Sequence, residues 1–170
     1  MRFRALVKIP VTGSVHLRDV ARGDLETFLE HQLDPDAARM AAFPSRDREA
    51  FMAHWTKILA DQSNTIRTII HDGDIAGNIL SFQESGRMLV GYWVGKRYWG
   101  KGVATKALSQ FLQVVKARPL YAYVAKHNAA SIRVLQKCGF IITCEDPGSS
   151  RTSEGEVEEV LLKLEVGTPE

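Results

Sequence analysis

The sequence predicts an α+β fold, in which a mostly antiparallel sheet contains one parallel pair of strands and is flanked by about four helices. Two observations lead to this prediction. Three β-rich runs between residues 64 and 95 are joined by short turns, which is typical of an antiparallel meander. A strand, a long amphipathic helix and a further strand then follow over residues 88–125. Such a crossover makes the fourth and fifth strands parallel neighbours.

The N-terminal part is predicted to form a short strand and two helices. Residues 14–18 alternate in polarity, as a half-buried strand does. Residues 21–33 carry leucines and a phenylalanine at helical spacing, and Pro35 ends this helix because the residue before a proline avoids helical dihedral angles. A second apolar stripe over residues 45–62 predicts the next helix, with Ser45 as its N-cap.

The middle of the chain changes to strand periodicity. The runs "NTIRTII" and "IAGNILSF" are rich in β-forming residues and are joined by Asp72 and Gly73. An Asp-Gly pair between two such runs is a strong hairpin signal. A second turn at residues 84–87 leads into "MLVGYWVG", which completes the meander.

The C-terminal half alternates helices and strands. Residues 103–116 have a broad apolar face and predict the clearest helix of the chain, which ends before Pro119. "PLYAYVA" predicts a buried strand, and Asn128 caps a further helix that ends at Gly139. "FIITCE" and "EVEEVLLKLEV" predict the last two strands. The polar segment between them, "DPGSSRTSEG", is predicted to be a mobile loop.

Composition restricts the function classes. The 170 residues are 45% hydrophobic and 25% charged, which predicts one ordinary globular domain. The net charge is only +2, and the cations are spread along the chain, whereas nucleic-acid binders concentrate their cations in a patch. No apolar stretch suits a signal peptide or a membrane span, so we expect a cytoplasmic protein that binds neither nucleic acid nor membrane. Cys138 and Cys144 match no zinc or redox spacing, no histidine pair has metal-ligand spacing, and no metal is expected.

The stretch "GKRYWGKG", residues 95–102, places glycines and cations between a predicted strand and a predicted helix. It nearly fits the Walker pattern, but Gly102 stands where a Ser or Thr would bind Mg²⁺. The dinucleotide pattern fails as well, since Thr105 replaces its third glycine. Glycines and free N–H groups at a helix N-terminus still suit a phosphate held without metal, such as the pyrophosphate of coenzyme A. The alternative is a tight turn with surface cations.

Two separate motifs resemble the GNAT superfamily of N-acetyltransferases. Arg97-x-x-Gly100-x-Gly102 is similar to the family's (Gln/Arg)-x-x-Gly-x-(Gly/Ala) signature. The wider string "GYWVGKRYWGKGVATKAL" looks like the RimJ/RimL-type branch, which acetylates ribosomal-protein N-termini. "NAASIRVLQKCGF" resembles the family's Asn-x-x-(Ser/Ala) helix that ends in Gly-Phe. The predicted element order also matches the acyl-CoA N-acyltransferase fold, as a single domain over residues 1–170 with a core from about 14 to 164.

The resemblance implies acetyl-CoA as co-substrate and a primary amine as acceptor. In the family the fourth and fifth strands splay apart, and the pantetheine arm lies in the gap like an additional strand. A backbone N–H near Val94 would then stabilise the oxyanion that develops on the thioester carbonyl. The residues that the resemblance assigns to cofactor binding are Trp93, Val94, Arg97, Tyr98, Trp99, Gly100, Lys101, Gly102, Val103, Ala104, Thr105, Asn128 and Ser131.

The candidate catalytic residues are Ser131 and Glu84. Many family members carry a tyrosine seven residues after the helix Asn, where it protonates the departing thiolate, but this chain has Leu135 there. In the ribosomal-protein branch a serine three residues after the Asn lies near the thiol, which implies that role for Ser131. The alternative is an ordinary polar residue in a first helical turn. Glu84 is the candidate base for the amine proton, and its alternative is a solvated turn carboxylate.

Other residues with reactive side chains have less specific roles. His71 and His54 are alternatives to Glu84 as base, or else surface and edge residues. Cys138 is conceivable as an acyl carrier, but its place on the apolar side of a helix favours a buried hydrophobe. Trp93 and Trp99 either line the groove or pack.

The acceptor is not identified, because the first two predicted helices carry no recognisable motif. A protein N-terminus and a small amine both fit. Two alternative functions remain: a catalytically weak acyl-CoA-binding module, favoured by the absence of Tyr at position 135, and a nucleotide-binding protein that uses the near-Walker turn. A homodimer is left open.

Overall fold

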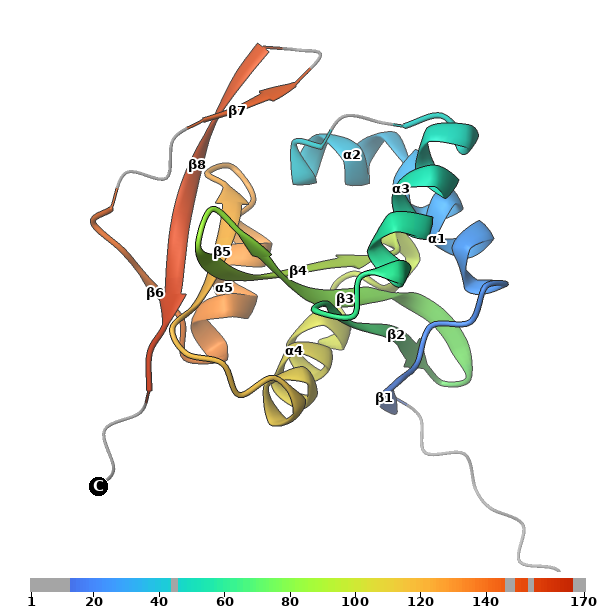
Figure 1. Ribbon diagram of the computed structural model, residues 1–170, viewed down its shortest axis with the longest axis horizontal. Coiled ribbons are helices and arrows are strands. Elements are labelled where there is room, and N and C mark those ends of the chain that lie inside the picture. The colour runs from blue at the N-terminus through green and yellow to red at the C-terminus, as the bar shows by residue number, and fades with distance from the viewer. Residues whose placement is uncertain (1–12, 44–45, 146–148, 153–154, 167–170) are drawn as a thin grey trace, which may run out of the picture.

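The computed structural model describes residues 13–43, 46–145, 149–152 and 155–166. Its centre is a mixed sheet with the strand order β1-β2-β3-β4-β5-β8-β6, and β7 pairs with β8 (Figure 1). The strands are Val15–Arg18 (β1), Thr65–His71 (β2), Asp74–Glu84 (β3), Arg87–Val94 (β4), Leu120–Ala125 (β5), Ile141–Ile142 (β6), Ser149–Thr152 (β7) and Gly155–Leu164 (β8). The helices are Asp24–Leu33 (α1), Pro35–Ala41 (α2), Arg48–Ala60 (α3), the short 3₁₀ helix Lys96–Tyr98 (η1), Val103–Val114 (α4) and Ala129–Lys137 (α5).

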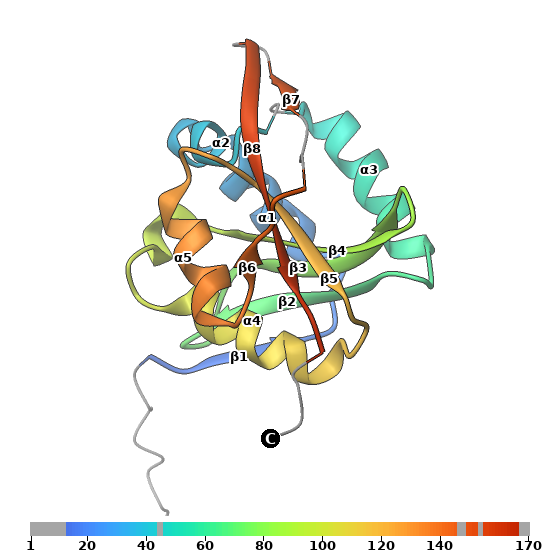
Figure 2. The ribbon, with the colours of Figure 1, turned by 90° about the vertical axis from the view of Figure 1, so that its left-hand side faces the viewer.

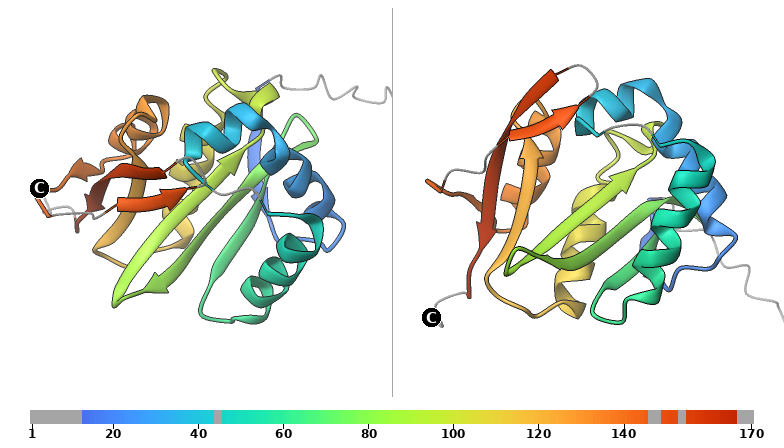
Figure 3. Two further views of the ribbon diagram at one scale, coloured as in Figure 1. Left: turned by 90° about the horizontal axis from the view of Figure 1, so that it is seen from above. Right: turned by 45° about the horizontal axis from the view of Figure 1, so that its top comes forward.

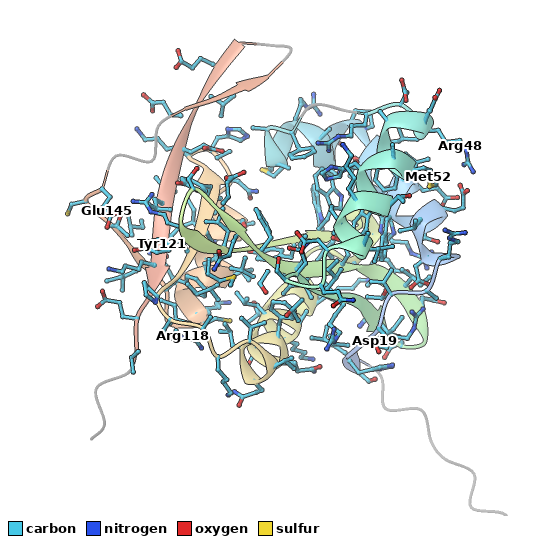
Figure 4. All side chains as sticks on the ribbon, viewed as in Figure 1. Asp19, Arg48, Met52, Arg118, Tyr121 and Glu145 are labelled. Carbon is cyan, nitrogen blue, oxygen red and sulfur yellow. The ribbon has the colours of Figure 1, made fainter. Side chains whose placement is uncertain are left out.

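One parallel contact divides the sheet. The described strands pair in antiparallel fashion except β4 and β5, which are parallel neighbours as predicted. They pair only at Leu89 and Tyr121; Figure 4 labels Tyr121. Beyond this point the two strands diverge, which the right-hand view of Figure 3 shows plainly. The predicted meander and the splay between the fourth and fifth strands are therefore confirmed.

Helices cover both faces of the sheet (Figure 2). On one face α4 and α5 pack over the main core, where Leu108, Phe111 and Leu135 are almost fully buried. On the other face α1 and α3 pack against β2 and β3 around Phe28 and Trp55. No helix among the described residues is both long and apolar enough to cross a membrane.

A buried carboxylate fixes the start of α1 to the sheet. Asp24 accepts hydrogen bonds from Arg18 Nη1 at 2.6 Å, Thr68 Oγ1 at 2.7 Å and the Ala21 N–H at 2.9 Å. Burial alone would raise the pKa of Asp24, but these bonds outweigh it and hold the pKa below its usual value. The cluster ties β1, β2 and α1 together, and so fixes the helix from which α2 continues.

The structure contains a helix, α2, that the sequence reading missed. Pro35 does end α1, but it also begins α2, because proline is favoured at the first position of a helix. Asp34 caps α2 by accepting hydrogen bonds from the N–H groups of Asp36 and Ala37 at 2.9 and 3.0 Å. The end of α1 and the start of α2 therefore coincide at Pro35, and the sequence predicted only the end of α1.

Two other boundaries differ from the prediction. The segment predicted to be a mobile loop contains β7, so that prediction was wrong over 149–152. β7 has no apolar alternation to mark it, and it forms through backbone pairing with β8. The N-cap of α3 is Asp47, which accepts a hydrogen bond from the Ala50 N–H at 2.8 Å. Ser45, the predicted cap, lies outside the described residues.

Gly77 allows β3 to approach the C-terminal end of β4. It pairs with Val94, and a Cβ atom at position 77 would lie 1.9 Å from the carbonyl oxygen of Trp93. No side chain fits at that distance, so the path of β4 at Trp93 and Val94 requires a glycine at this place.

Gly77→Ala is expected to lower the free energy of unfolding by about 3 kcal/mol, the upper end of the range for overpacking, because the backbone of β4 must shift. Denaturant unfolding measures this loss. Gly91→Ala is the matched control in the same pair of strands, since a Cβ there meets no atom within 4 Å. Equal losses in the two variants would contradict the assigned role of Gly77.

Candidate active site

A pocket of about 400 Å³ lies where the end of β4, the turn that follows it, and the first turns of α4 and α5 come together, with α2 as a further wall. It lies beside the end of β4, past the point at which β4 and β5 diverge. Most of the residues that the family resemblance assigned to the cofactor line it, although they come from distant parts of the chain. These are Trp93, Val94, Tyr98, Trp99, Gly100, Gly102, Val103, Ala104, Thr105, Asn128 and Ser131.

Two residues of the predicted cofactor set do not line the pocket with their side chains. Arg97 is 74% exposed, its guanidinium lies over the Tyr98 ring, and its Nη2 is 4.0 Å from Asp74 Oδ2. Lys101 is exposed and is also absent from the lining. The Arg97 charge is therefore directed toward Tyr98 and Asp74, whereas the sequence had led us to expect it at the pocket.

The turn after β4 is shaped by two glycines in the left-handed region. Gly100 has φ 72° and Gly102 has φ 73°, values that residues with a Cβ rarely adopt. Gly102 is also the N-cap of α4 and offers no side-chain oxygen to the helix. The first N–H groups of α4 are thus left for another acceptor, and such a helix end attracts anions.

Trp99 ties this turn to the strand before it. Its indole Nε1 donates a hydrogen bond to the Val94 carbonyl oxygen at 2.9 Å. The side chain is 39% exposed and lines the pocket. Trp99 therefore both packs and lines the groove, the two roles that the sequence left open.

The pocket includes residues that sequence reading missed. On α5, Ala130, Arg133, Val134 and Lys137 share one face at spacings of three and four, and all line the pocket. Arg133 and Lys137 are the charged residues among the described lining, so the charge there is positive. The sequence could have indicated these residues through their helical spacing after Asn128. α2 contributes a wall that had no signal, since the helix itself was not predicted.

Ser131 is held from two sides. Its backbone N–H donates to Asn128 Oδ1 at 3.2 Å, which confirms Asn128 as the cap of α5. Its Oγ lies 2.7 Å from the phenol oxygen of Tyr92, on β4. Burial raises the pKa of Tyr92 to about 12, so the phenol is protonated at neutral pH. Tyr92 also lines the pocket, and the sequence reading had not singled it out.

Glu84 is far from this site. The β3–β4 register pairs Glu84 with Arg87 and Gly77 with Val94, at opposite ends of the hairpin. Seven residues of strand separate these pairs, a distance of about 23 Å. The expectation that Glu84 lies beside the reacting groups is therefore wrong, because the end of β3 and the end of β4 point in opposite directions.

The two histidines considered as bases also lie outside the pocket lining. His71 is buried at the end of β2, with its ring centroid 5.8 Å from that of Tyr98 and its Nε2 3.5 Å from Asp72 Oδ2. His54 lies on α3, where burial lowers its pKa. The described lining contains neither a carboxylate nor an imidazole.

Cys138 has a structural position. It is half-buried at the end of α5 against the main core, and its Sγ lies 3.7 Å from the Thr105 carbonyl oxygen. Burial raises the pKa of the thiol, which disfavours the thiolate that an acyl carrier needs. Within the described part of the chain, no group of three or more His, Cys, Asp or Glu residues is arranged to hold a metal ion.

The comparison with known families agrees with this geometry. Residues 14–141 match the family described as acetyltransferase (GNAT) domain. The chain therefore belongs to this family, and its class is that of the acetyl-CoA-dependent N-acetyltransferases. The family resemblance read from the turn and the α5 motif is confirmed.

Individual relatives are distant. The chain is 25% identical over 142 residues to the uncharacterized N-acetyltransferase p20 of Bacillus licheniformis, covering 76% of this chain and 80% of that protein. Among solved structures, spermidine N-acetyltransferase from Vibrio cholerae in complex with CoA and spermine superposes with a TM-score of 0.70 at 14% identity, over 88% of this chain and 95% of that one. RimL, a ribosomal L7/L12 α-N-protein acetyltransferase in complex with CoA, superposes with a TM-score of 0.69 at 16% identity, over 91% of this chain and 95% of that one. These likenesses establish a shared fold.

Asn128→Ala is expected to cost about 1 kcal/mol of stability, because it removes the oxygen that caps α5. Asn128→Ser keeps a capping oxygen and is expected to unfold at nearly the same urea concentration as the native protein. The midpoints of urea unfolding separate the two. Equal midpoints for both variants would show that the cap does not hold the first turn of α5.

Proposed function

We propose that this protein transfers the acetyl group of acetyl-CoA to a primary amine by direct attack of the amine on the thioester. The observation that carries the proposal is one continuous pocket that joins the glycine turn and the uncapped start of α4 to the open edge of β4. A long ligand with an anionic end and an amide-containing arm has the chemistry that these surfaces complement.

The anionic part of coenzyme A fits the turn. We assign its pyrophosphate to the backbone N–H groups from Arg97 to Thr105, which need no metal if cations lie nearby. Arg133 and Lys137 provide positive side chains in the same pocket. Asn128 uses its Oδ1 on the α5 cap, so its amide N–H₂ is left for the cofactor.

The thioester fits the open edge of β4. Past Leu89 this edge has no strand partner on the β5 side, and the Val94 carbonyl oxygen already accepts a hydrogen bond from Trp99 Nε1, so we assign the Val94 N–H to the thioester carbonyl. A fixed N–H at that carbonyl stabilises the charge that develops on its oxygen as the amine adds. Ser131, across the pocket on α5, is assigned to the departing sulfur.

The amine must lose a proton to react, because an ammonium has no free electron pair. The described pocket lining has no carboxylate or imidazole to take that proton. We therefore assign the proton to solvent water, and expect the rate to rise with pH as the free amine becomes deprotonated.

The acceptor is assigned to the side of β4 that Trp93 faces. Successive strand residues point to opposite faces, so Trp93 lies opposite Tyr92, and its ring meets Phe43 at 6.2 Å between centroids. Protein N-termini and small amines both remain candidates; the structurally similar RimL and spermidine N-acetyltransferase are named for one of each. We further propose a single acetyltransferase domain of the RimJ/RimL-type branch, active in the cytoplasm, with a homodimer left open.

The experiment that tests the proposal is acetyl-CoA turnover, followed by free-thiol release, with a panel of N-terminal peptides and polyamines. Release that depends on the amine, together with the acetylated product by mass spectrometry, supports the proposal. The second candidate, a binding module of the same fold, is favoured by Leu135, which is 1% exposed and replaces the usual tyrosine. Saturable acetyl-CoA binding with no acetylated product from any amine would support that candidate.

Gly102→Ala is expected to weaken acetyl-CoA binding about 10- to 100-fold, because the strained turn moves and charge-assisted hydrogen bonds of the α4 start are lost. Isothermal titration calorimetry measures the affinity. Gly86→Ala is the matched control: Gly86 has φ 79°, and it lies in the β3–β4 turn at the opposite end of β4. Both variants carry similar backbone strain, so a comparable loss of binding in Gly86→Ala would contradict a local role for the turn.

A further inference from the structure

Tyr92 and Ser131 form a hydrogen-bonded pair in the lining of the pocket. Tyr92 comes from β4 and Ser131 from the first turn of α5, 39 residues later in the chain. Within the described structure, the hydrogen-bond partners of the Tyr92 phenol both belong to Ser131: Oγ at 2.7 Å and the backbone carbonyl oxygen at 3.3 Å. The side chain of Tyr92 otherwise packs against the main core, so its hydroxyl has a fixed position.

The direction of this hydrogen bond decides what Ser131 can do. A serine hydroxyl has one hydrogen to donate and two lone pairs, and so has a tyrosine hydroxyl. If Tyr92 donates to Ser131 Oγ, the serine hydrogen remains available to the pocket. If Ser131 donates to Tyr92, the serine hydrogen is used, and the phenol hydrogen is left with a carbonyl oxygen at 3.3 Å, which is long for an O–H···O bond.

We propose that Tyr92 is a positioning residue, whose phenol donates to Ser131 Oγ and thereby directs the Ser131 hydrogen toward the sulfur of the thioester. The inference rests on the proposed function. A phenol is a better donor than an aliphatic hydroxyl, and 2.7 Å is the usual length of an O–H···O hydrogen bond. The raised pKa of Tyr92 keeps its hydrogen in place throughout the neutral range.

The pair supplies the hydrogen-bond donor for the departing sulfur that Leu135 cannot provide. Leu135 lies one helical turn beyond Ser131 and is buried in the main core, and its side chain has no hydrogen-bond donor. In this chain a phenol reaches the start of α5 from the neighbouring strand instead. It acts through a serine, so the hydrogen-bond donor that meets the sulfur is Ser131.

Neither hydroxyl gains or loses a proton in the reaction step. The amine nitrogen forms the new C–N bond, the C–S bond breaks, and its electron pair goes to sulfur. The proton lost by the amine goes to water. Ser131 stabilises the departing thiolate by a hydrogen bond and keeps its own proton, because an alkoxide is a much stronger base than a thiolate.

The first test is a double-mutant cycle on kcat. Ser131→Ala and Tyr92→Phe are each expected to lower kcat about 10- to 100-fold, the effect of a hydrogen bond to a charged group, with KM for acetyl-CoA essentially unchanged. If Tyr92 acts through Ser131, the double variant is no slower than Ser131→Ala alone. Losses that multiply would overturn the proposal, and so would a Tyr92→Phe variant faster than the native enzyme, which would show that Ser131 had been donating to Tyr92.

The matched control is Tyr123→Phe. This residue also has a partly buried phenol in the same sheet, on β5, where its oxygen accepts a hydrogen bond from Arg87 Nη1 at 3.1 Å. It does not line the pocket. Tyr123→Phe is expected to leave kcat unchanged, and a loss equal to that of Tyr92→Phe would reduce the Tyr92 effect to a general effect on the fold.

The second test does not depend on turnover. The thiol of bound CoA is titrated by the ultraviolet absorbance of its thiolate, with no amine present. A hydrogen bond from Ser131 lowers the pKa of that thiol in the native protein, so Tyr92→Phe and Ser131→Ala are each expected to raise it by about 1 to 2 pH units. A thiol pKa that is identical in all three proteins would overturn the proposal.

The two tests separate this inference from the proposed function. If the native protein acetylates no amine but the thiol pKa rises in both variants, the proposed function is wrong and the positioning role of Tyr92 stands. If the native protein acetylates amines but neither kcat nor the thiol pKa changes in Tyr92→Phe, the proposed function stands and the positioning role is wrong. If turnover and the shift in thiol pKa are both absent, both are wrong.

Discussion

The single parallel contact between β4 and β5, at Leu89 and Tyr121, is the constraint on which the rest of the site depends. Because the strands diverge beyond it, β4 keeps an open edge inside an otherwise continuous sheet, and a pocket replaces the missing pairing. α2 closes one side of this opening by reaching the chain after β5, where His127 Nε2 lies 2.8 Å from the Arg39 carbonyl oxygen. Had the ladder continued, β4 and β5 would pair along their length and the edge of β4 would not be open to a ligand.

The elements around this opening are fixed by backbone requirements more than by side-chain chemistry. Gly77 lets β3 approach the end of β4, and Gly102 gives the left-handed residue that starts α4 without a side-chain cap. Gly77 avoids a steric clash with β4, and Gly102 leaves the first N–H groups of α4 without a side-chain acceptor. Arg133 and Lys137 then set the sign of the charge in the pocket. Shape, free amides and positive charge thus come from three different elements that the splay brings together.

The first turn of α5 combines a helix cap with the serine to which we assign a chemical role. Asn128 caps the helix through its oxygen, and the cap holds the Ser131 backbone beside the phenol of Tyr92. A serine hydroxyl alone rotates freely and has no preferred donor direction. In our proposal the buried phenol of Tyr92, 2.7 Å from Ser131 Oγ, supplies that direction, and a chain with Leu135 thereby retains a hydrogen-bond donor at this end of the pocket.

The sequence by itself determined the element order, the parallel crossover, the glycine turn and the Asn128 cap, because each depends on local periodicity or on residues with special dihedral angles. It could not reveal α2, whose start coincides with the end of α1 at Pro35, nor the distance of Glu84 from the pocket, which follows from strand direction. Only the tertiary structure decided that Tyr92 meets Ser131. Contact between side chains 39 residues apart depends on how β4 and α5 pack, and no local pattern in the sequence encodes that packing.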